Sequence, residues 1–194
     1  MTALPDAKVL IVATSGFEEW ELFGPLEILR KQGADVKLAS LDLKPIQATV
    51  HDDPGKTIRP DLTVDEANSD DFDALILPGG VRNPDQLRMH GNVIALITRF
   101  AEQDKAIGAI CHGPWLLVEA DLLRDRTATS WPSIRTDLRN AGAMVVDEPA
   151  VTDGKIVTSR NPDDVEAFTG ALIALIEDMP ATTREIREPS ELPA

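Results

Sequence analysis

The chain has 194 residues, 19 of them basic and 33 acidic, which gives a formal net charge of −14 at pH 7. Proteins neutralise nucleic-acid phosphates and anionic membrane surfaces with clustered lysine and arginine side chains, so this composition argues against both as partners. The length predicts one domain, residues 1–179, followed by a proline-containing tail at residues 180–194.

The cysteine and hydropathy patterns also restrict the kind of protein. The single cysteine, Cys111, can form neither an intramolecular disulfide nor a cysteine-rich zinc site. The apolar run at Val9–Ala13 is too short for a signal-peptide core, and no stretch approaches the roughly 20 apolar residues of a membrane span. By elimination we expect a cytoplasmic protein.

Strand-length apolar runs alternate with helical patterns in the first half of the chain. In order, the patterns predict a strand at Lys8–Ala13, a helix at Glu18–Gln32, a strand at Asp35–Ser40, a hairpin within residues 45–62 and a strand at Asp73–Pro78. Proline inside a helix removes a hydrogen bond, so Pro25 should kink the first helix or mark where its regular part begins.

The second half repeats the alternation. It predicts helices at Pro84–Met89, Asn92–Gln103, Pro114–Ala120, Ser133–Asn140 and Asp163–Asp178, strands at Ala106–Ile110 and Ala143–Val146, and a hairpin around Gly154. Such alternation indicates an α/β fold with a parallel sheet covered on both faces. Ligands bind beyond the carboxyl ends of strands in such sheets, which directs attention to the loops at residues 14–21, 79–85 and 111–114.

Cys111 is the first candidate functional residue. It directly follows the apolar strand AIGAI and directly precedes a helix, within the sequence ICHGP. A strand-to-helix elbow exposes its side chain at the sheet edge and strains its backbone. A helix N-terminus stabilises a thiolate, so we expect the Cys111 thiol to have a depressed pKa.

His112 is the candidate base for this thiol. Adjacent side chains usually diverge, so their spacing alone does not establish contact, although the bend at an elbow permits it. The other two histidines, His51 and His90, lie in polar surroundings and are interpreted as surface residues.

Three carboxyl groups, Glu18, Glu19 and Glu21, follow the first strand. An ionised carboxyl beside a cysteine would raise the thiol pKa by repulsion. It assists only if desolvation keeps it protonated, so that it donates a hydrogen bond to sulfur. Apolar neighbours make this plausible for one of the three, whereas Glu19 is interpreted as a solvated helix-start residue.

Gly79 and Gly80 close the third predicted core strand. Paired glycines at this point either form an ordinary tight turn or direct a backbone N–H toward an oxyanion. Phosphate-binding glycine loops, zinc-hydrolase motifs and calcium-binding loops are missing from the sequence, which weakens the interpretations that depend on them.

Several motifs together resemble the PfpI family of the ThiJ/PfpI superfamily, in its general-stress-protein and intracellular-peptidase-like branch. The resemblance covers residues 7–178 and is carried by GFEEWEL, DALILPGG, AICHGPWLL, TSWPS, AGAMVVDE and VTDGKIVTSR, in that order. It implies a flavodoxin-like three-layer α/β sandwich related to class I glutamine amidotransferase domains.

The resemblance also implies roles for particular residues. Cys111 matches the nucleophile, His112 the histidine of peptidase-like members, and Glu21 the protonated glutamate beside the sulfur, with Glu18 in the same loop. Gly79 and Gly80 match the turn that lends N–H groups to the oxyanion site. Asp85 falls where peptidase-like members carry a triad glutamate that acts on a neighbouring subunit. Aspartate is one methylene shorter, which puts the triad and peptidase activity in doubt.

The family's activities leave two classes of function open. One is a hydrolase, deglycase or glyoxalase in which the Cys111 thiolate attacks a carbonyl of a small dicarbonyl, a glycated adduct or a peptide, without a metal or organic cofactor. The other is a redox-responsive stress protein or chaperone with little or no catalysis. The resemblance further implies a homodimer or a larger homo-oligomer.

Overall fold

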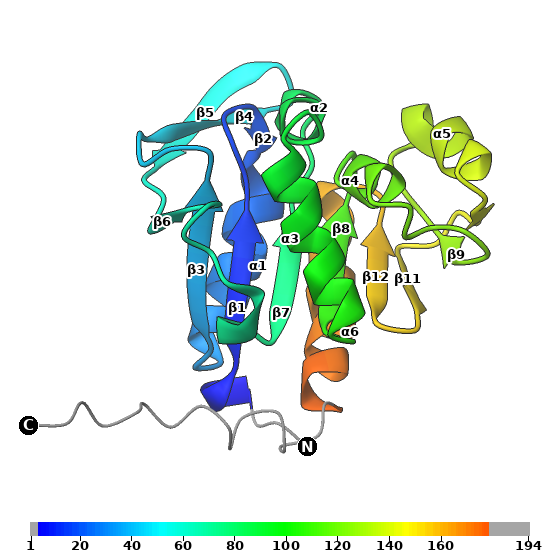
Figure 1. Ribbon diagram of the computed structural model, residues 1–194. Coiled ribbons are helices and arrows are strands. Elements are labelled where there is room, and N and C mark those ends of the chain that lie inside the picture. The colour runs from blue at the N-terminus through cyan, green and yellow to red at the C-terminus, as the bar shows by residue number, and fades with distance from the viewer. Residues whose placement is uncertain (1–3, 179–194) are drawn as a thin grey trace, which may run out of the picture.

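A central seven-stranded sheet organises the molecule (Figure 1), whose computed structural model describes residues 4–178. Its strand order is β11-β12-β8-β7-β1-β3-β6, and all neighbours are parallel except β11 and β12. The strands are β1 (Lys8–Val12), β3 (Asp35–Ser40), β6 (Leu62–Thr63), β7 (Ala74–Leu77), β8 (Ala106–Ile110), β11 (Ala150–Asp153) and β12 (Ile156–Ser159). The predicted tail at residues 180–194 lies outside the described residues.

Helices cover both faces of this sheet, as predicted. The α-helices are α1 (Glu19–Lys31), α2 (Arg82–Leu87), α3 (Gly91–Glu102), α4 (Pro114–Glu119), α5 (Arg135–Asn140) and α6 (Val165–Glu177), and short 3-10 turns occupy Leu4–Asp6, Ser69–Asp71, Pro132–Ile134 and Pro162–Asp164. Helices α1 and α6 pack together on one face, whereas α3 and α4 lie on the other (Figure 1).

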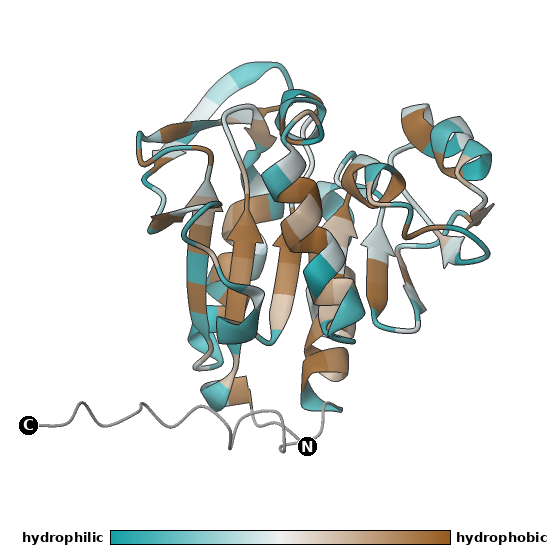
Figure 2. Ribbon diagram, viewed as in Figure 1, coloured by the Kyte–Doolittle hydropathy of each residue, from teal (hydrophilic) through white to brown (hydrophobic). Residues whose placement is uncertain are grey.

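The alternation of side chains along β1 explains the two layers of core. Val9 and Ile11 pack in one apolar cluster with residues of α1 and α6, and Leu10 and Val12 pack in a second cluster with residues of α3 and α4. Both faces of a central parallel strand are buried, so β1 is apolar at nearly every position, as the hydropathy colouring shows (Figure 2).

The first predicted helix begins one residue later than expected. Phe17 and Glu18 form strand β2, which pairs with β4 (Ile46–Val50). The predicted hairpin is present as β4 and β5 (Asp53–Ile58), and with β2 it makes a small separate sheet. Pro25 lies inside α1 and does not mark its start.

The strand predicted at Ala143–Val146 is not part of the central sheet. Its core, β10 (Met144–Val145), pairs with β9 (Thr127–Ala128) in a separate two-stranded ribbon. Strands of two residues carry too little periodicity to be assigned a partner from sequence.

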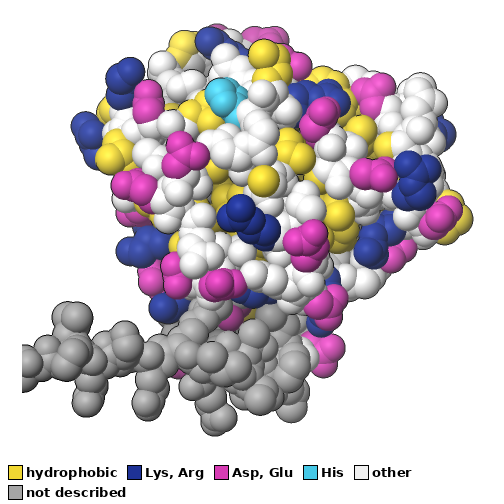
Figure 3. Space-filling view, in the orientation of Figure 1, with side chains coloured by type: hydrophobic (Ala, Val, Ile, Leu, Met, Phe, Trp, Pro, Cys, Tyr) yellow, Lys and Arg dark blue, Asp and Glu magenta, His cyan; other side chains and the backbone are white. Residues whose placement is uncertain are grey.

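The surface is polar and mixed in charge. Figure 3 shows acidic side chains spread over one face with basic ones between them. Within residues 4–178, no helix is both long enough and apolar enough to cross a membrane.

Buried Asn83 joins the ends of two central strands. Its Oδ1 accepts from the Thr14 N–H at 2.7 Å, and its Nδ2 donates to the carbonyls of Pro78 and Gly79 at 2.9 and 3.1 Å. It thereby fixes the glycine turn that follows β7.

We predict that Asn83→Ala lowers the free energy of unfolding by about 2–4 kcal/mol, because it leaves buried backbone groups without partners. The matched control is Asn140→Ala at an exposed helix end, which should change stability by less than about 0.5 kcal/mol. Urea denaturation measures both, and equal stabilities of the two variants would contradict the assignment.

Candidate active site

Cys111 lies at a strained elbow between β8 and α4, as predicted. Its φ of +62° is in the left-handed region that non-glycine residues rarely occupy. Two backbone hydrogen bonds hold it there: its N–H donates to the Ser159 carbonyl at 3.0 Å, and its own carbonyl accepts from the Trp131 N–H at 3.0 Å. Backbone strain of this kind persists where the surrounding structure enforces it, which is typical of functional sites.

The elbow brings the side chains of Cys111 and His112 into contact. The Cys111 Sγ and the His112 Nδ1 are 3.2 Å apart, and the other ring nitrogen, Nε2, is 3.2 Å from Ser133 Oγ. A neutral ring that accepts the thiol proton at Nδ1 carries its own proton at Nε2, where Ser133 accepts it.

Two tryptophans desolvate His112. The ring centroids of Trp115 and Trp131 lie 5.3 and 6.0 Å from that of the imidazole. Burial lowers the pKa of His112 to about 4, because the charged form loses its hydration. At neutral pH His112 is therefore an uncharged acceptor.

Glu21 reaches the sulfur from α1 and is fully buried. Its Oε2 accepts the Gly79 N–H at 2.8 Å. Within residues 4–178 its Oε1 has no hydrogen-bond partner, and the carboxyl group interacts with the Cys111 thiol. Burial raises the pKa of Glu21 to about 8, so the carboxyl holds its proton at neutral pH, as the protonated-glutamate hypothesis requires.

The expected depression of the Cys111 pKa is wrong for this cavity. Burial raises the pKa of the Cys111 thiol, and negative charge on Glu21 raises it further. The backbone N–H groups of Gly80 and His112 lower it, but they do not offset desolvation. A helix N-terminus favours the thiolate, but burial outweighs this local effect at Cys111.

The two glycines of the turn have different uses. A Cβ on Gly79 would lie 2.5 Å from Glu21 Oε2 and 2.6 Å from the Cys111 Cβ, so only glycine fits. Its N–H is taken by Glu21 and is not free for an oxyanion. Gly80, with φ +73°, directs its N–H to the Cys111 sulfur. Of the two predicted donors, Gly80 is thus the one that faces the Cys111 sulfur.

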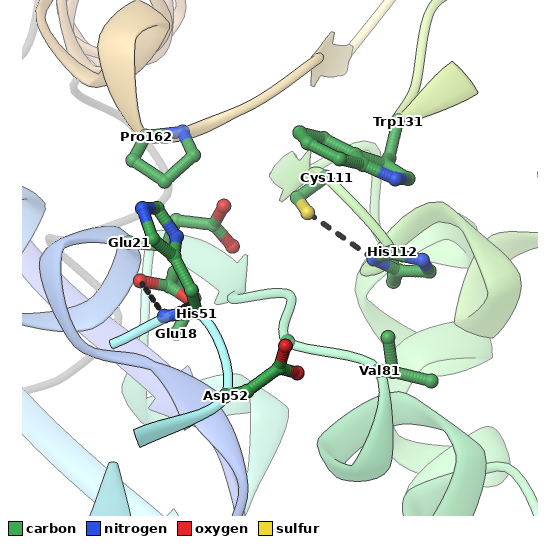
Figure 4. A pocket seen from close by; sticks show the side chains of 10 residues that line it. Glu18, Glu21, His51, Asp52, Val81, Cys111, His112, Trp131 and Pro162 are labelled. Carbon is green, nitrogen blue, oxygen red and sulfur yellow. Dashed lines mark hydrogen bonds between the residues drawn. The ribbon is translucent and has the colours of Figure 1, made fainter. Parts of the chain in front are cut away.

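These groups open onto a cavity of about 340 Å³. Figure 4 shows His112 and Trp131 on one side of Cys111, with Glu18, Glu21 and His51 on the other. The lining residues are Glu18, Glu21, His51, Asp52, Gly80, Val81, Cys111, His112, Trp131 and Pro162. Five of the predicted site residues are therefore together here.

Asp85 is outside this cavity. It is exposed in the first turn of α2, and nothing within the described chain brings it to the sulfur. Any contribution to catalysis would require a second copy of the chain.

The turn between β4 and β5 also lines the cavity, and this was not predicted from the sequence. His51 and Asp52 are exposed, as the surface interpretation predicted for His51, yet they form one wall. The His51 N–H donates to Glu18 Oε2 at 3.2 Å, while burial raises the pKa of Glu18. The pairing of β2 with β4 places this hairpin tip over the site, and no local motif indicates that pairing.

Trp131, Ser133 and Pro162 were also missed as site residues, although TSWPS was noted as a motif. His90 is exposed and lies outside the cavity. Across residues 4–178, no group of three histidine, cysteine, aspartate or glutamate residues is arranged to hold a metal ion.

The chain is similar to known proteins in sequence and in fold. Residues 7–175 match the DJ-1/PfpI family. Deglycase TK1284 of Thermococcus kodakarensis is 38% identical over 87% of this chain and 99% of its own length. General stress protein 18 of Bacillus subtilis is 40% identical over 88% of this chain and 98% of its own. The crystal structure of Drosophila melanogaster DJ-1beta superposes with a TM-score of 0.80 at 27% identity, covering 93% of this chain and 95% of that one.

We predict that Glu21→Gln becomes more stable relative to the wild type as pH rises from 4.5 to about 8. In the wild type the unfolded carboxyl ionises across this window while the folded one cannot, so the wild type loses stability that glutamine retains. At about 1.4 kcal/mol per pKa unit, the difference should grow by several kcal/mol.

Denaturant titrations of both proteins at several pH values measure this difference. The exposed control, Glu102→Gln, should show no comparable trend. A stability difference between the wild type and Glu21→Gln that is constant with pH would show that Glu21 is ionised in the folded protein.

Proposed function

The chain belongs to the DJ-1/PfpI family, and on that premise we propose that it is an enzyme whose Cys111 attacks a carbonyl carbon. The substrate class is a small dicarbonyl, a glycated adduct or a peptide. The observation that carries the proposal is the 3.2 Å contact between Cys111 Sγ and a neutral His112 Nδ1 at the floor of an open cavity.

The two pKa shifts determine how the nucleophile forms. Because burial raises the pKa of Cys111 and lowers that of His112, the resting pair is a thiol and a neutral imidazole. As sulfur bonds to the carbonyl carbon, the thiol proton passes to Nδ1 and the carbonyl π electrons move to oxygen. The thiolate then forms within the reaction step and is not present beforehand.

The Gly80 N–H faces the Cys111 sulfur, so it stabilises the oxyanion that forms. The imidazolium subsequently returns its proton to the oxyanion or to a leaving amine. Ser133 holds the Nε2 side of the ring throughout, which fixes the orientation of His112.

The names of relatives support an enzymatic role without specifying the reaction. Deglycase TK1284 is named for an activity and General stress protein 18 for a response. Both names fit a site built around one reactive cysteine.

One observation favours a second candidate function, a redox-responsive protein. Protonated Glu21 lies against the sulfur with Oε1 unpartnered, where it would donate a hydrogen bond to an oxidised cysteine. One molecule of hydrogen peroxide would transfer an oxygen to sulfur and leave as water, giving sulfenic acid, and a second would oxidise it in the same way to sulfinic acid.

We also propose that the chain assembles as a homodimer or larger homo-oligomer. Exposed Asp85 can act on a Cys111 site only if that site belongs to another copy. Otherwise its place in the first turn of α2 fits a helix-start residue.

We predict that Cys111→Ser abolishes turnover and that His112→Gln lowers kcat by about 10²–10⁴-fold, the usual worth of a general base. The measurement is a panel of methylglyoxal, a glycated peptide and an unmodified peptide. His90→Gln, outside the cavity, is the matched control and should retain wild-type rates.

The same panel separates the two candidate functions. Turnover that disappears with Cys111 supports the enzyme. Stoichiometric oxidation of Cys111 by peroxide, with no turnover of any panel member by the wild type, would replace it with the redox protein.

We predict that Asp85→Asn keeps the assembly intact and lowers kcat if Asp85 takes part in proton transfer between subunits. Sedimentation at micromolar concentration measures the assembly. A monomeric wild type would overturn the oligomer proposal, and an unchanged kcat would leave Asp85 as a helix-start residue.

A further inference from the structure

The charges around the cavity are strongly one-sided. Two carboxyl groups besides the protonated Glu21, those of Glu18 and Asp52, line it, and the described lining includes no lysine or arginine. Of its two histidines, His112 is neutral because burial lowers its pKa. A small anion entering this cavity therefore meets no strong permanent positive charge on its walls.

Nearby arginine does not supply the missing charge. Arg160 lies two residues before the lining residue Pro162, but its guanidinium donates to both Asp164 oxygens at 2.8 and 3.0 Å and to Asp147 at 3.0 Å. These two carboxylates neutralise the positive charge of Arg160 where it lies.

A second, independent observation points to a ligand at this cavity. Glu21, which lines it, is fully buried, and its Oε1 has no hydrogen-bond partner among the described residues. Leaving a buried polar atom unpaired costs about 1–3 kcal/mol. A protonated carboxyl there can donate to an uncharged carbonyl or hydroxyl group of a ligand as well as to sulfur.

The opposite wall is apolar. Trp131 and Val81 line it on the side of His112, whereas Pro162 lies across from them near Glu21 (Figure 4), and the Trp131 indole stacks on His112. The wall suits the alkyl part of a carbonyl compound and offers nothing that would neutralise a carboxylate.

We propose that Asp52 and Glu18 are specificity-determining residues that exclude carbonyl compounds bearing a carboxylate, such as α-oxo acids, and admit uncharged or cationic ones. The inference rests on the proposed function only in naming the reactant a carbonyl. The exclusion itself is a property of the cavity. The chain's net charge of −14 acts in the same direction at longer range.

The expected size of the effect follows from Coulomb's law. Two like charges within one small cavity repel each other appreciably at an effective dielectric constant near 20. One such repulsion, partly screened, corresponds to roughly a tenfold discrimination.

Labelling of Cys111 tests the charge preference without any turnover. The probes are two methanethiosulfonates with the same reactive group, one carrying a cationic trimethylammonium-ethyl chain and the other an anionic sulfonato-ethyl chain. Each transfers its thioalkyl group to the thiolate and releases methanesulfinate. Because the same thiolate attacks both reagents at the same pH, the ratio of the two labelling rates does not depend on the Cys111 pKa.

We expect the cationic-to-anionic rate ratio of the folded protein to exceed that of the urea-unfolded protein by about tenfold or more. Asp52→Asn and Glu18→Gln should each reduce this excess at least about twofold, and added salt should reduce it as well. The control variant Glu102→Gln removes the same charge and should leave the rate ratio unchanged. Glu102 is the last residue of α3, which precedes the start of β8, whereas Cys111 follows the end of β8.

A folded-state ratio equal to that of the unfolded chain would overturn the proposal. An equal reduction of the excess rate ratio in Glu102→Gln would also overturn it, since the net charge of the chain rather than the cavity would then cause the preference. The labelling ratio can show no charge preference while the substrate panel shows turnover, and the reverse can also occur. Failure of the charge proposal is therefore distinct from failure of the proposed function.

If the protein turns over methylglyoxal, its kcat/KM for glyoxylate should be at least about tenfold lower, and Asp52→Asn should reduce this difference between the two substrates.

Discussion

The contact of a buried carboxyl with the cysteine sulfur constrains the rest of the site. Glu21 comes from α1 on one face of the sheet, and Cys111 from the end of β8. They meet only because Gly79 has no side chain at the point where a Cβ would strike both. The Gly79 N–H secures one carboxyl oxygen at 2.8 Å, while the other has no hydrogen-bond partner among the described residues. Helix, turn and elbow must therefore be placed together, and Asn83 holds the turn from below by bonding Thr14, Pro78 and Gly79.

Desolvation sets the charge state of the reacting groups. It raises the pKa of Glu21 to about 8, lowers that of His112 to about 4 and raises that of the Cys111 thiol. All three groups are then uncharged at neutral pH. Attack by the sulfur then requires that the thiol proton move to His112 as the new bond forms. The same arrangement serves carbonyl addition and oxidation by peroxide, which explains why one cysteine fits both candidate functions.

The alternation of buried strands and helices was sufficient to predict the α/β sandwich, because strands such as β1 and β8 are apolar at nearly every position. The elbow at Cys111 was equally visible, since a strand runs directly into HGP. What could not be predicted depends on contacts between distant segments. The tip of the β4–β5 hairpin reaches the cavity only through the pairing of β2 with β4. The direction of the Cys111 pKa failed for a related reason: the degree of burial is a tertiary property, whereas the helix dipole is local.

The central claim is that Glu21 carries a proton at neutral pH and directs it toward Cys111. Neutron diffraction from crystals of the perdeuterated protein at neutral pH observes that proton directly. The account predicts nuclear density for deuterium on Glu21 Oε1, on the line to the Cys111 sulfur. A carboxylate without deuterium at this position, with deuterium only on sulfur, would contradict it.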